Sequence, residues 1–140
     1  MNVPVRAIRV LLIDHHPTFL RLAADYVREH YPDEITVVGT ARTGEEGLAL
    51  ALSLRPRVIL LDPYASGSSA KATLPRLRAA LPAVGIVVLS THSENVYRRD
   101  ALKAGADEVV SKSRVIAELL PAIRRVVRDD RQRHRRGKHP

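Results

Sequence analysis

Short apolar segments alternate five times along this chain with segments whose apolar residues recur at intervals of three and four. The apolar segments occupy residues 8–13, 35–38, 58–61, 85–89 and 108–111. Such short apolar runs are typical of strands covered on both faces. Apolar residues at intervals of three and four are typical of helices with one buried face. Strands separated by helices favour a parallel sheet with right-handed crossovers, and five units are too few for an eight-fold barrel. We therefore expect an α/β fold with a doubly wound, five-stranded parallel sheet and helices on both faces.

The predicted helices lie near residues 17–29, 43–52, 71–81, 93–104 and 116–127. Thr43 and Glu46 form a capping box, which marks the start of the second helix. Because proline disrupts a helix interior, Pro75 and Pro121 indicate that the third and fifth helices begin later than periodicity alone implies. The apolar stripe of the last helix is predicted to contain Ile116, Leu119, Leu120, Ile123 and Val127.

The positive charge of the chain is concentrated at its carboxyl end. The 140 residues carry a net charge of +8, and residues 124–140 hold eight Lys or Arg against two Asp. Few apolar residues follow Val127, so this segment cannot bury enough surface to hold itself folded. We therefore expect one domain over residues 5–127 and a basic, disordered tail over residues 128–140.

Several functional classes lack the sequence features that they need. No segment approaches the roughly 20 apolar residues of a membrane span, and the chain contains no cysteine. These features favour a cytoplasmic protein without membrane contact. Glycine-rich nucleotide-binding motifs and a hydrolase nucleophile elbow are absent from the sequence. The tail lacks Phe, Tyr and Trp for base stacking, so nucleic-acid binding would be limited to non-specific attraction of phosphates.

Four polar residues follow the predicted strands at their carboxyl ends: Asp14, Asp62, Ser90 and Lys112. Each alone has an ordinary explanation as a helix cap or turn former. In open α/β sheets, however, ligands bind beyond the carboxyl ends of the strands. Two carboxylates, a hydroxyl and an ammonium in one solvent-accessible crevice would suit a phosphoryl group and a cation such as Mg²⁺. We expect these four side chains to cluster there.

Four segments resemble motifs of one known family. They are residues 8–17 (Ile-Arg-Val-Leu-Leu-Ile-Asp-His-His-Pro), 60–62 (Leu-Leu-Asp), 87–90 (Val-Val-Leu-Ser) and 105–113, which contains the lysine. Together they are similar to the receiver domains of two-component response regulators of the NarL/FixJ type, over residues 8–127. The resemblance implies a flavodoxin-like sheet with strand order 2-1-3-4-5.

The resemblance also implies a role for each polar residue. Asp62 would accept phosphate from a sensor histidine kinase or a phosphotransfer protein. Ser90 would contact the phosphoryl group and Lys112 would neutralise its charge. Asp14, Asp62 and the backbone carbonyl of Tyr64 would hold Mg²⁺. The protein would not be an enzyme beyond gaining and losing its own phosphate, and it would signal to an output protein or through a homodimer.

One departure from the family pattern affects the expected cation site. His15 occupies the position of the second acid, and imidazole suits transition metals better than it suits Mg²⁺. Loss of that acid is expected to weaken Mg²⁺ binding. We expect His15, His16 and His92 to be solvated or hydrogen-bonded within the protein rather than to form a metal cluster.

Three functional hypotheses remain open at this stage. The first is a phosphorylation-controlled switch, and the second is a pseudo-receiver that binds partners without phosphorylation. The third is a nucleic-acid-binding protein that uses its basic tail. Mg²⁺ titration would discriminate between the first two hypotheses.

Overall fold

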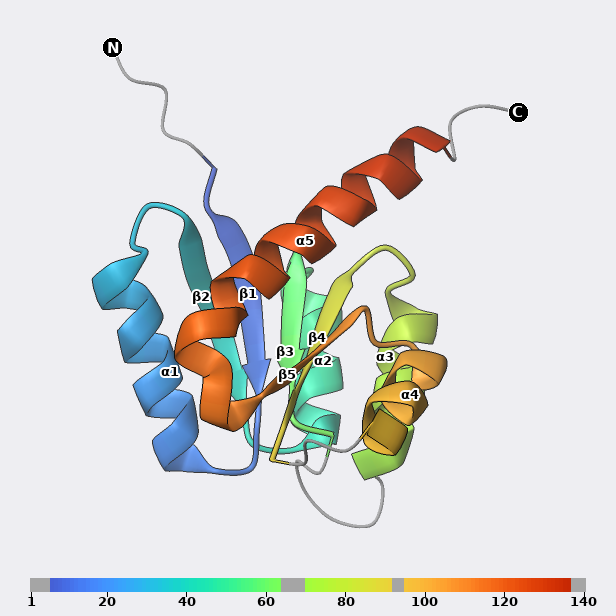
Figure 1. Cartoon of the computed structure of the whole chain (residues 1–140), viewed down its shortest axis with the longest axis horizontal. Coiled ribbons are helices and arrows are strands. Elements are labelled where there is room, and N and C mark those ends of the chain that lie inside the picture. Colours follow the sequence, from blue (N-terminus) through green and yellow to red (C-terminus); the bar gives the residue numbers. More distant parts are fainter. Residues whose placement is uncertain (1–5, 64–69, 92–94, 137–140) are drawn as a thin grey trace.

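The computed structural model describes residues 6–63, 70–91 and 95–136, and strands alternate with helices throughout (Figure 1). The elements in chain order are β1 (Ile8–Ile13), α1 (Pro17–His30), β2 (Ile35–Ala41), α2 (Gly44–Leu54), β3 (Val58–Leu61), α3 (Ala70–Ala80), β4 (Gly85–Ser90), α4 (Asn95–Ala104), β5 (Glu108–Ser111), the 3₁₀ turn η1 (Lys112–Arg114) and α5 (Val115–Arg136). Among the described residues, no helix combines the length and the apolarity needed to cross a membrane.

All strand pairs in the sheet are parallel, and the strand order is β2-β1-β3-β4-β5. The α/β class and the 2-1-3-4-5 order are therefore confirmed. β1 is hydrogen-bonded on both sides, with Leu12 opposite Thr40 of β2 and Leu60 of β3. A register shift opposite Val10 and Leu11 accommodates one extra residue in β2.

Helices cover both faces of the sheet, and alternate strand residues face the two layers (Figure 1). Leu12 and Leu60 pack into a cluster with residues of α1 and α5. Leu11 and Ile59 point to the opposite face, where they pack with residues of α2, α3 and α4. Each fully buried side chain of this size contributes about 1.5–3 kcal/mol. The double coverage explains why the strands read as continuous apolar runs in the sequence.

Helix α2 approaches β1 closely because Gly47 has no side chain. A Cβ atom at Gly47 would lie 2.5 Å from Cδ1 of Ile13, closer than side chains pack. The capping prediction is confirmed, since the backbone N–H of Glu46 donates to Oγ1 of Thr43 at 3.0 Å. Local capping and close packing together hold α2 beside the end of β1.

The expected late starts of α3 and α5 are wrong. α3 begins at Ala70 and α5 at Val115, so Pro75 and Pro121 lie inside the helices. Both prolines are on exposed positions, where water can hydrate the carbonyl that the ring leaves without a donor. The apolar residues packed on the sheet from each helix offset the remaining cost of about 3 kcal/mol.

Helix α5 differs from expectation at both ends. Ile116 is 68% exposed rather than part of the buried stripe, since it lies in the first turn, directly after the chain leaves the sheet. At the other end the helix continues to Arg136, whereas we expected disorder after Val127. Arg and Gln are strong helix formers, so the backbone can remain helical after the last core contact.

The side chain of Arg78 links α3 to both neighbouring loops at the amino-terminal edge of the sheet. Its guanidinium donates to the carbonyl oxygens of Gly105 at 2.9 and 3.0 Å and of Val84 at 2.6 Å. It also pairs with Asp107 at 2.7 Å, and the same Asp107 oxygen accepts from the backbone N–H of Ile86. This network of contacts holds the loop before β4 against the loop before β5.

Candidate functional site

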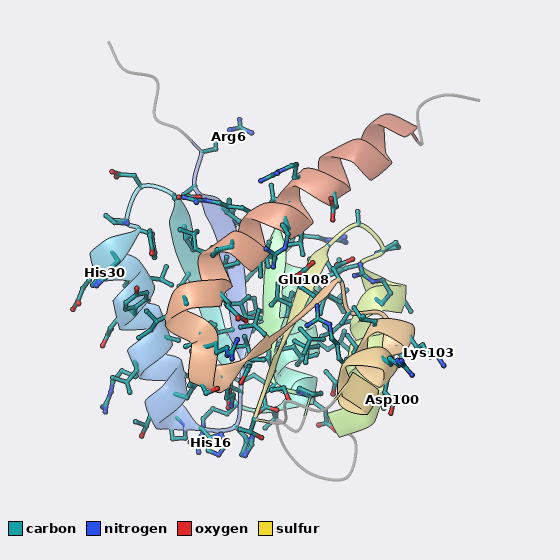
Figure 2. All side chains as sticks on the ribbon, viewed as in Figure 1. Arg6, His16, His30, Asp100, Lys103 and Glu108 are labelled. Atoms are coloured by element: carbon teal, nitrogen blue, oxygen red, sulfur yellow. The ribbon has the colours of Figure 1, made fainter. Side chains whose placement is uncertain are left out.

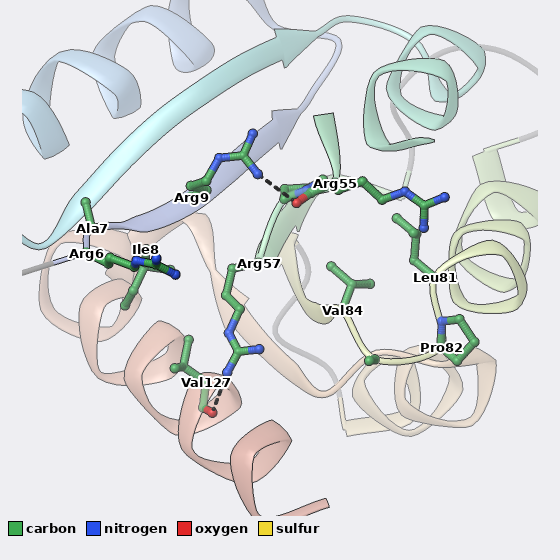
Figure 3. Close-up of a pocket in the computed structure, with 12 residues that line it drawn as sticks. Arg6, Ala7, Ile8, Arg9, Arg55, Arg57, Leu81, Pro82, Val84 and Val127 are labelled. Carbon is green, nitrogen blue, oxygen red and sulfur yellow. Dashed lines mark hydrogen bonds between the residues drawn. The ribbon is translucent and has the colours of Figure 1, made fainter. Parts of the chain in front are cut away.

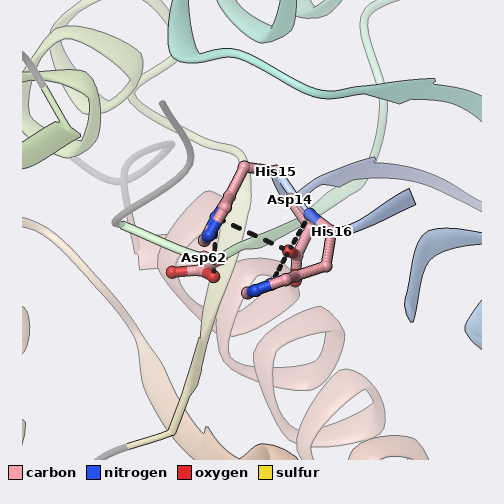
Figure 4. Close-up of side chains that lie close together, drawn as sticks. All are labelled: Asp14, His15, His16 and Asp62. Carbon is pink, nitrogen blue, oxygen red and sulfur yellow. Dashed lines mark hydrogen bonds and ion pairs between the residues drawn. The ribbon is translucent and has the colours of Figure 1, made fainter. Parts of the chain in front are cut away.

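Two carboxylates lie side by side at the carboxyl ends of β1 and β3 (Figure 4). The backbone N–H of Asp14 donates to the carbonyl of Ala41 at 2.9 Å, and that of Asp62 donates to the carbonyl of Ile13 at 2.8 Å. Asp14 is 1% exposed and Asp62 is 4% exposed. The parallel ladder thus continues one residue beyond each strand and sets the positions of both acids.

Lys112 bridges the two acids. Its Nζ lies 2.6 Å from Oδ2 of Asp14 and 3.0 Å from Oδ2 of Asp62. The same ammonium lies 4.5 Å from the centre of the Phe19 ring, which provides a cation–π contact from α1. One positive charge therefore serves two nearly buried negative charges. Burial of charges at this depth is favourable only when they are paired in this way.

Ser90 is the last residue of β4, and it is 1% exposed at the same edge of the sheet. Its Cα pairs in register with Ser111, the residue that precedes Lys112. The four predicted residues therefore lie at the carboxyl ends of four strands, along one edge of the sheet. Asp14, Asp62 and Ser90 are all buried, and the solvent-accessible crevice stays a prediction. The side chain of His15 lies beside the carboxylates, and 39% of it is exposed.

Both histidines after β1 turn toward the carboxylates (Figure 4). Nδ1 of His15 lies 3.5 Å from Oδ2 of Asp62 and 3.9 Å from Oδ1 of Asp14. Nδ1 of His16 lies 3.2 Å from Oδ1 of Asp14, which also accepts from the His16 backbone N–H at 2.9 Å. Both histidines were expected to be solvated or hydrogen-bonded within the protein, and His16 is hydrogen-bonded to Asp14. The His15 side chain is 39% exposed, and its buried Nδ1 has no hydrogen-bond partner within the described part of the chain.

Two residues named in the sequence predictions lie outside the described residues: Tyr64, expected as a carbonyl ligand, and His92, expected to take no part in a metal cluster. Phe19 was not among the predicted site residues. The available signal was that Phe19 is the only phenylalanine of the chain and follows Asp14 by five residues. Its contact with Lys112 joins α1 to the end of β5 and could not be read from local spacing.

A hollow lies at the opposite, amino-terminal edge of the sheet (Figure 3). Its volume is about 560 Å³, and arginines contribute to its lining at positions 6, 9, 55 and 57. Two of these arginines donate to backbone carbonyls: Arg9 to Arg55 at 2.9 Å and Arg57 to Val127 at 3.4 Å. Figure 3 shows the labelled arginines around the hollow, and Figure 2 places Arg6 close to the amino-terminal end of β1. None of the four polar residues predicted as the site lines this hollow.

Comparisons with known proteins identify the family and the fold. The model of the response regulator receiver domain matches residues 10–124. The chain is 43% identical over 116 residues to the nitrate/nitrite response regulator protein NarL of Escherichia coli K12, a match that covers 81% of this chain and 52% of that protein. It is 35% identical over 117 residues to the transcriptional regulatory protein LiaR of Bacillus subtilis, covering 84% of this chain and 54% of that protein. The chain thus spans about half the length of these relatives.

Solved structures agree with the sequence comparisons. The response regulator domain of Thermotoga maritima CheB superposes with a TM-score of 0.76 and 28% identity, over 88% of this chain and 98% of that one. A two-component response regulator of the LuxR family from Aurantimonas sp. superposes with a TM-score of 0.80 and 25% identity, over 89% of this chain and 87% of that one.

Proposed function

Because this chain belongs to the family of response regulator receiver domains, we propose that it receives a phosphoryl group on Asp62 from a sensor histidine kinase or a phosphotransfer protein. The observation that carries this assignment is the position of Asp62 beside Asp14 and within 3.0 Å of the Lys112 ammonium. The modified domain then signals to an output protein or through a second copy of itself. A change of charge at one end of the sheet shifts the population of two conformations.

The side chains around Asp62 support such a transfer. An oxygen of the Asp62 carboxylate attacks phosphorus, the phosphorus–nitrogen bond of the donor histidine breaks, and the histidine nitrogen retains the electron pair and becomes protonated. Lys112 offsets the added negative charge, and the Ser90 hydroxyl donates to a phosphoryl oxygen. The chemistry of the chain is then confined to its own aspartate.

The proposed phosphoryl transfer also requires a divalent cation. The side chains that could bind it suit Mg²⁺ only in part. The carboxylates of Asp14 and Asp62 are the hard oxygen ligands that Mg²⁺ prefers. The imidazole of His15 stands at the position of the second acid and is a poor ligand for Mg²⁺. When bound, a dication would supply positive charge that balances the phosphoryl oxygens. We infer that Asp14 and Asp62 would hold this cation and that Mg²⁺ binds weakly.

Intact-mass measurement tests the phosphorylation proposal. The protein is incubated with acetyl phosphate in the presence of Mg²⁺ and, separately, Mn²⁺. We expect a species heavier by one phosphoryl group, which disappears in the Asp62→Asn variant. Asp25→Asn serves as the matched control, since Asp25 is an exposed aspartate of α1. If wild-type protein gains no mass with either cation, the domain acts as a phosphorylation-independent interaction module instead.

A further inference from the structure

We propose that the cation site of this chain selects first-row transition-metal dications over Mg²⁺, because His15 adds an imidazole nitrogen to the two carboxylates. This inference rests on the proposed function, which places the cation beside Asp14 and Asp62. It goes further because it names the class of cation that the site binds. The side chains of Asp14, His15, His16 and Asp62 each offer a ligand atom, and these four atoms lie within 4.8 Å of one another.

The spacing of the potential ligand atoms suits a metal with short bonds. Nδ1 of His15 is 3.5 Å from Oδ2 of Asp62 and 3.9 Å from Oδ1 of Asp14. Ligands held about 2.0–2.2 Å from a tetrahedral metal are separated by about 3.3–3.6 Å. The two nitrogen–oxygen separations therefore lie close to those of ligands that share one ion. Figure 4 shows the His15 ring directed toward both carboxylates.

The buried nitrogen of His15 is an independent indication that this site binds a metal ion. Nδ1 is buried and makes no hydrogen bond to any of the residues that the structure describes. A buried polar atom without a partner is unfavourable, and a metal ion would use its lone pair. The carboxylate of Asp14, whose side chain is 2% exposed, lies against the same space.

The charge of the cluster also favours a bound cation. Asp14 and Asp62 carry two negative charges and Lys112 carries one positive charge, so one negative charge remains when His15 is neutral. The ammonium contacts Oδ2 of each acid, which leaves Oδ1 of Asp14 directed toward the histidines. A dication in this space would reverse the residual charge without displacing Lys112.

His16 acts as a positioning residue for this site. Its backbone N–H and its ring nitrogen contact Oδ1 of Asp14 at 2.9 and 3.2 Å. Its ring also lies against the His15 ring, with centroids 3.8 Å apart. Groups that orient a metal ligand in this way contribute to affinity without binding the metal themselves.

Direct titration of the unphosphorylated chain of 140 residues tests the inference. Co²⁺, Mn²⁺ and Mg²⁺ are titrated separately by calorimetry, and Co²⁺ is also followed by its visible absorption, which reports nitrogen ligation. Nitrogen-containing sites generally bind Co²⁺ more tightly than Mn²⁺. We expect affinity in the order Co²⁺, Mn²⁺, Mg²⁺, with Co²⁺ at least about tenfold tighter than Mg²⁺.

Variants of His15 identify the ligand. His15→Asp should raise Mg²⁺ affinity, lower Co²⁺ affinity and increase phosphorylation of Asp62 in Mg²⁺ buffer. His15→Ala and His15→Gln should both weaken Co²⁺ binding, and circular dichroism of the pair establishes that the fold is retained. His30→Ala, which removes an exposed histidine at the end of α1, should leave all three affinities unchanged.

The outcomes separate this inference from the proposed function. The selectivity is overturned if the wild type binds Mg²⁺ as tightly as Co²⁺ or more tightly. It is also overturned if the folded His15→Gln variant keeps the Co²⁺ affinity of the wild type. In both cases Asp62 can still gain phosphate. Conversely, Co²⁺ selectivity without any mass increase on Asp62 supports the metal site and rejects the phosphorylation proposal.

Discussion

The ammonium of Lys112 lies 2.6 Å from one nearly buried carboxylate and 3.0 Å from another. Only 11% of the Lys112 side chain is exposed, so water screens these pairs weakly. Removal of one partner from such a pair leaves a buried charge without compensation, which costs more than the pair itself contributes. Lys112 is therefore expected to stabilise the folded domain in addition to assisting phosphorylation.

Replacement of Lys112 by Met tests this residue-scale expectation. The variant should unfold at lower urea concentration, with the free energy of unfolding reduced by about 3 kcal/mol at neutral pH. Lys103→Met, at an exposed position of α4, is the matched control and should change stability by less than about 0.5 kcal/mol. Equal stability of the two variants would show that the acids of the site tolerate the loss of their ammonium.

At the scale of elements, paired charges connect α5 to the residue before β2 and to the first residue of β5. Arg124 donates two hydrogen bonds of 2.8 Å to the carboxylate of Glu34, directly before β2. Arg125 pairs similarly with Glu108 at the start of β5, at 2.9 Å. The hydrogen bonds from Arg124 hold the pKa of Glu34 below its ordinary value of 4.5. Since the group is partly exposed, its contribution to stability is small.

The lowered pKa of Glu34 predicts a specific pH dependence. A carboxylate whose pKa is lower in the folded state stabilises the protein above its unfolded-state pKa, and this contribution is lost as pH falls through the folded-state value. Glu34→Gln should therefore lower Tm slightly at pH 7, and the difference from wild type should shrink below pH 4.5. Glu29→Gln, at an exposed position of α1, should show no such pattern. A difference that persists unchanged at low pH would contradict the role of the ionised pair.

At the scale of the whole molecule, the core packing that the structure describes in α5 extends to Val127. Val126 and Val127 are 1% and 8% exposed, and they are the last buried side chains that the structure describes. The backbone of α5 continues to Arg136 without a further described core contact. Helical conformation and contribution to stability are thus separate properties of this segment.

Two truncations test where the folded unit ends. Removal of residues 131–140 should change Tm by less than about 3 °C, because little apolar surface is lost. Removal of residues 124–140 takes away both buried valines and the pair with Glu34, and should lower Tm by more than about 10 °C. A large decrease after the shorter truncation would show that the basic segment packs on the domain.

The order of apolar and polar residues was sufficient to predict the fold class and the edge of the sheet that carries the site. The runs near Leu12 and Leu60 indicated doubly covered strands, since side chains alternate between faces with a period of two. The acids after these runs had to meet at one edge because parallel strands end together. Even the cap at Thr43 was readable, because it depends on residues three positions apart.

The remaining features depend on contacts between segments that are distant in the sequence. Exposure of Ile116 and the helical placement of Pro75 and Pro121 follow from how each helix lies on the sheet, which local spacing does not specify. The histidine rings turn toward carboxylates that Lys112 also contacts, although Lys112 lies almost one hundred residues further along the chain. Residue order determined which groups reach the site. Tertiary packing decided their burial and direction, because side-chain orientation depends on neighbours that only the folded chain brings together.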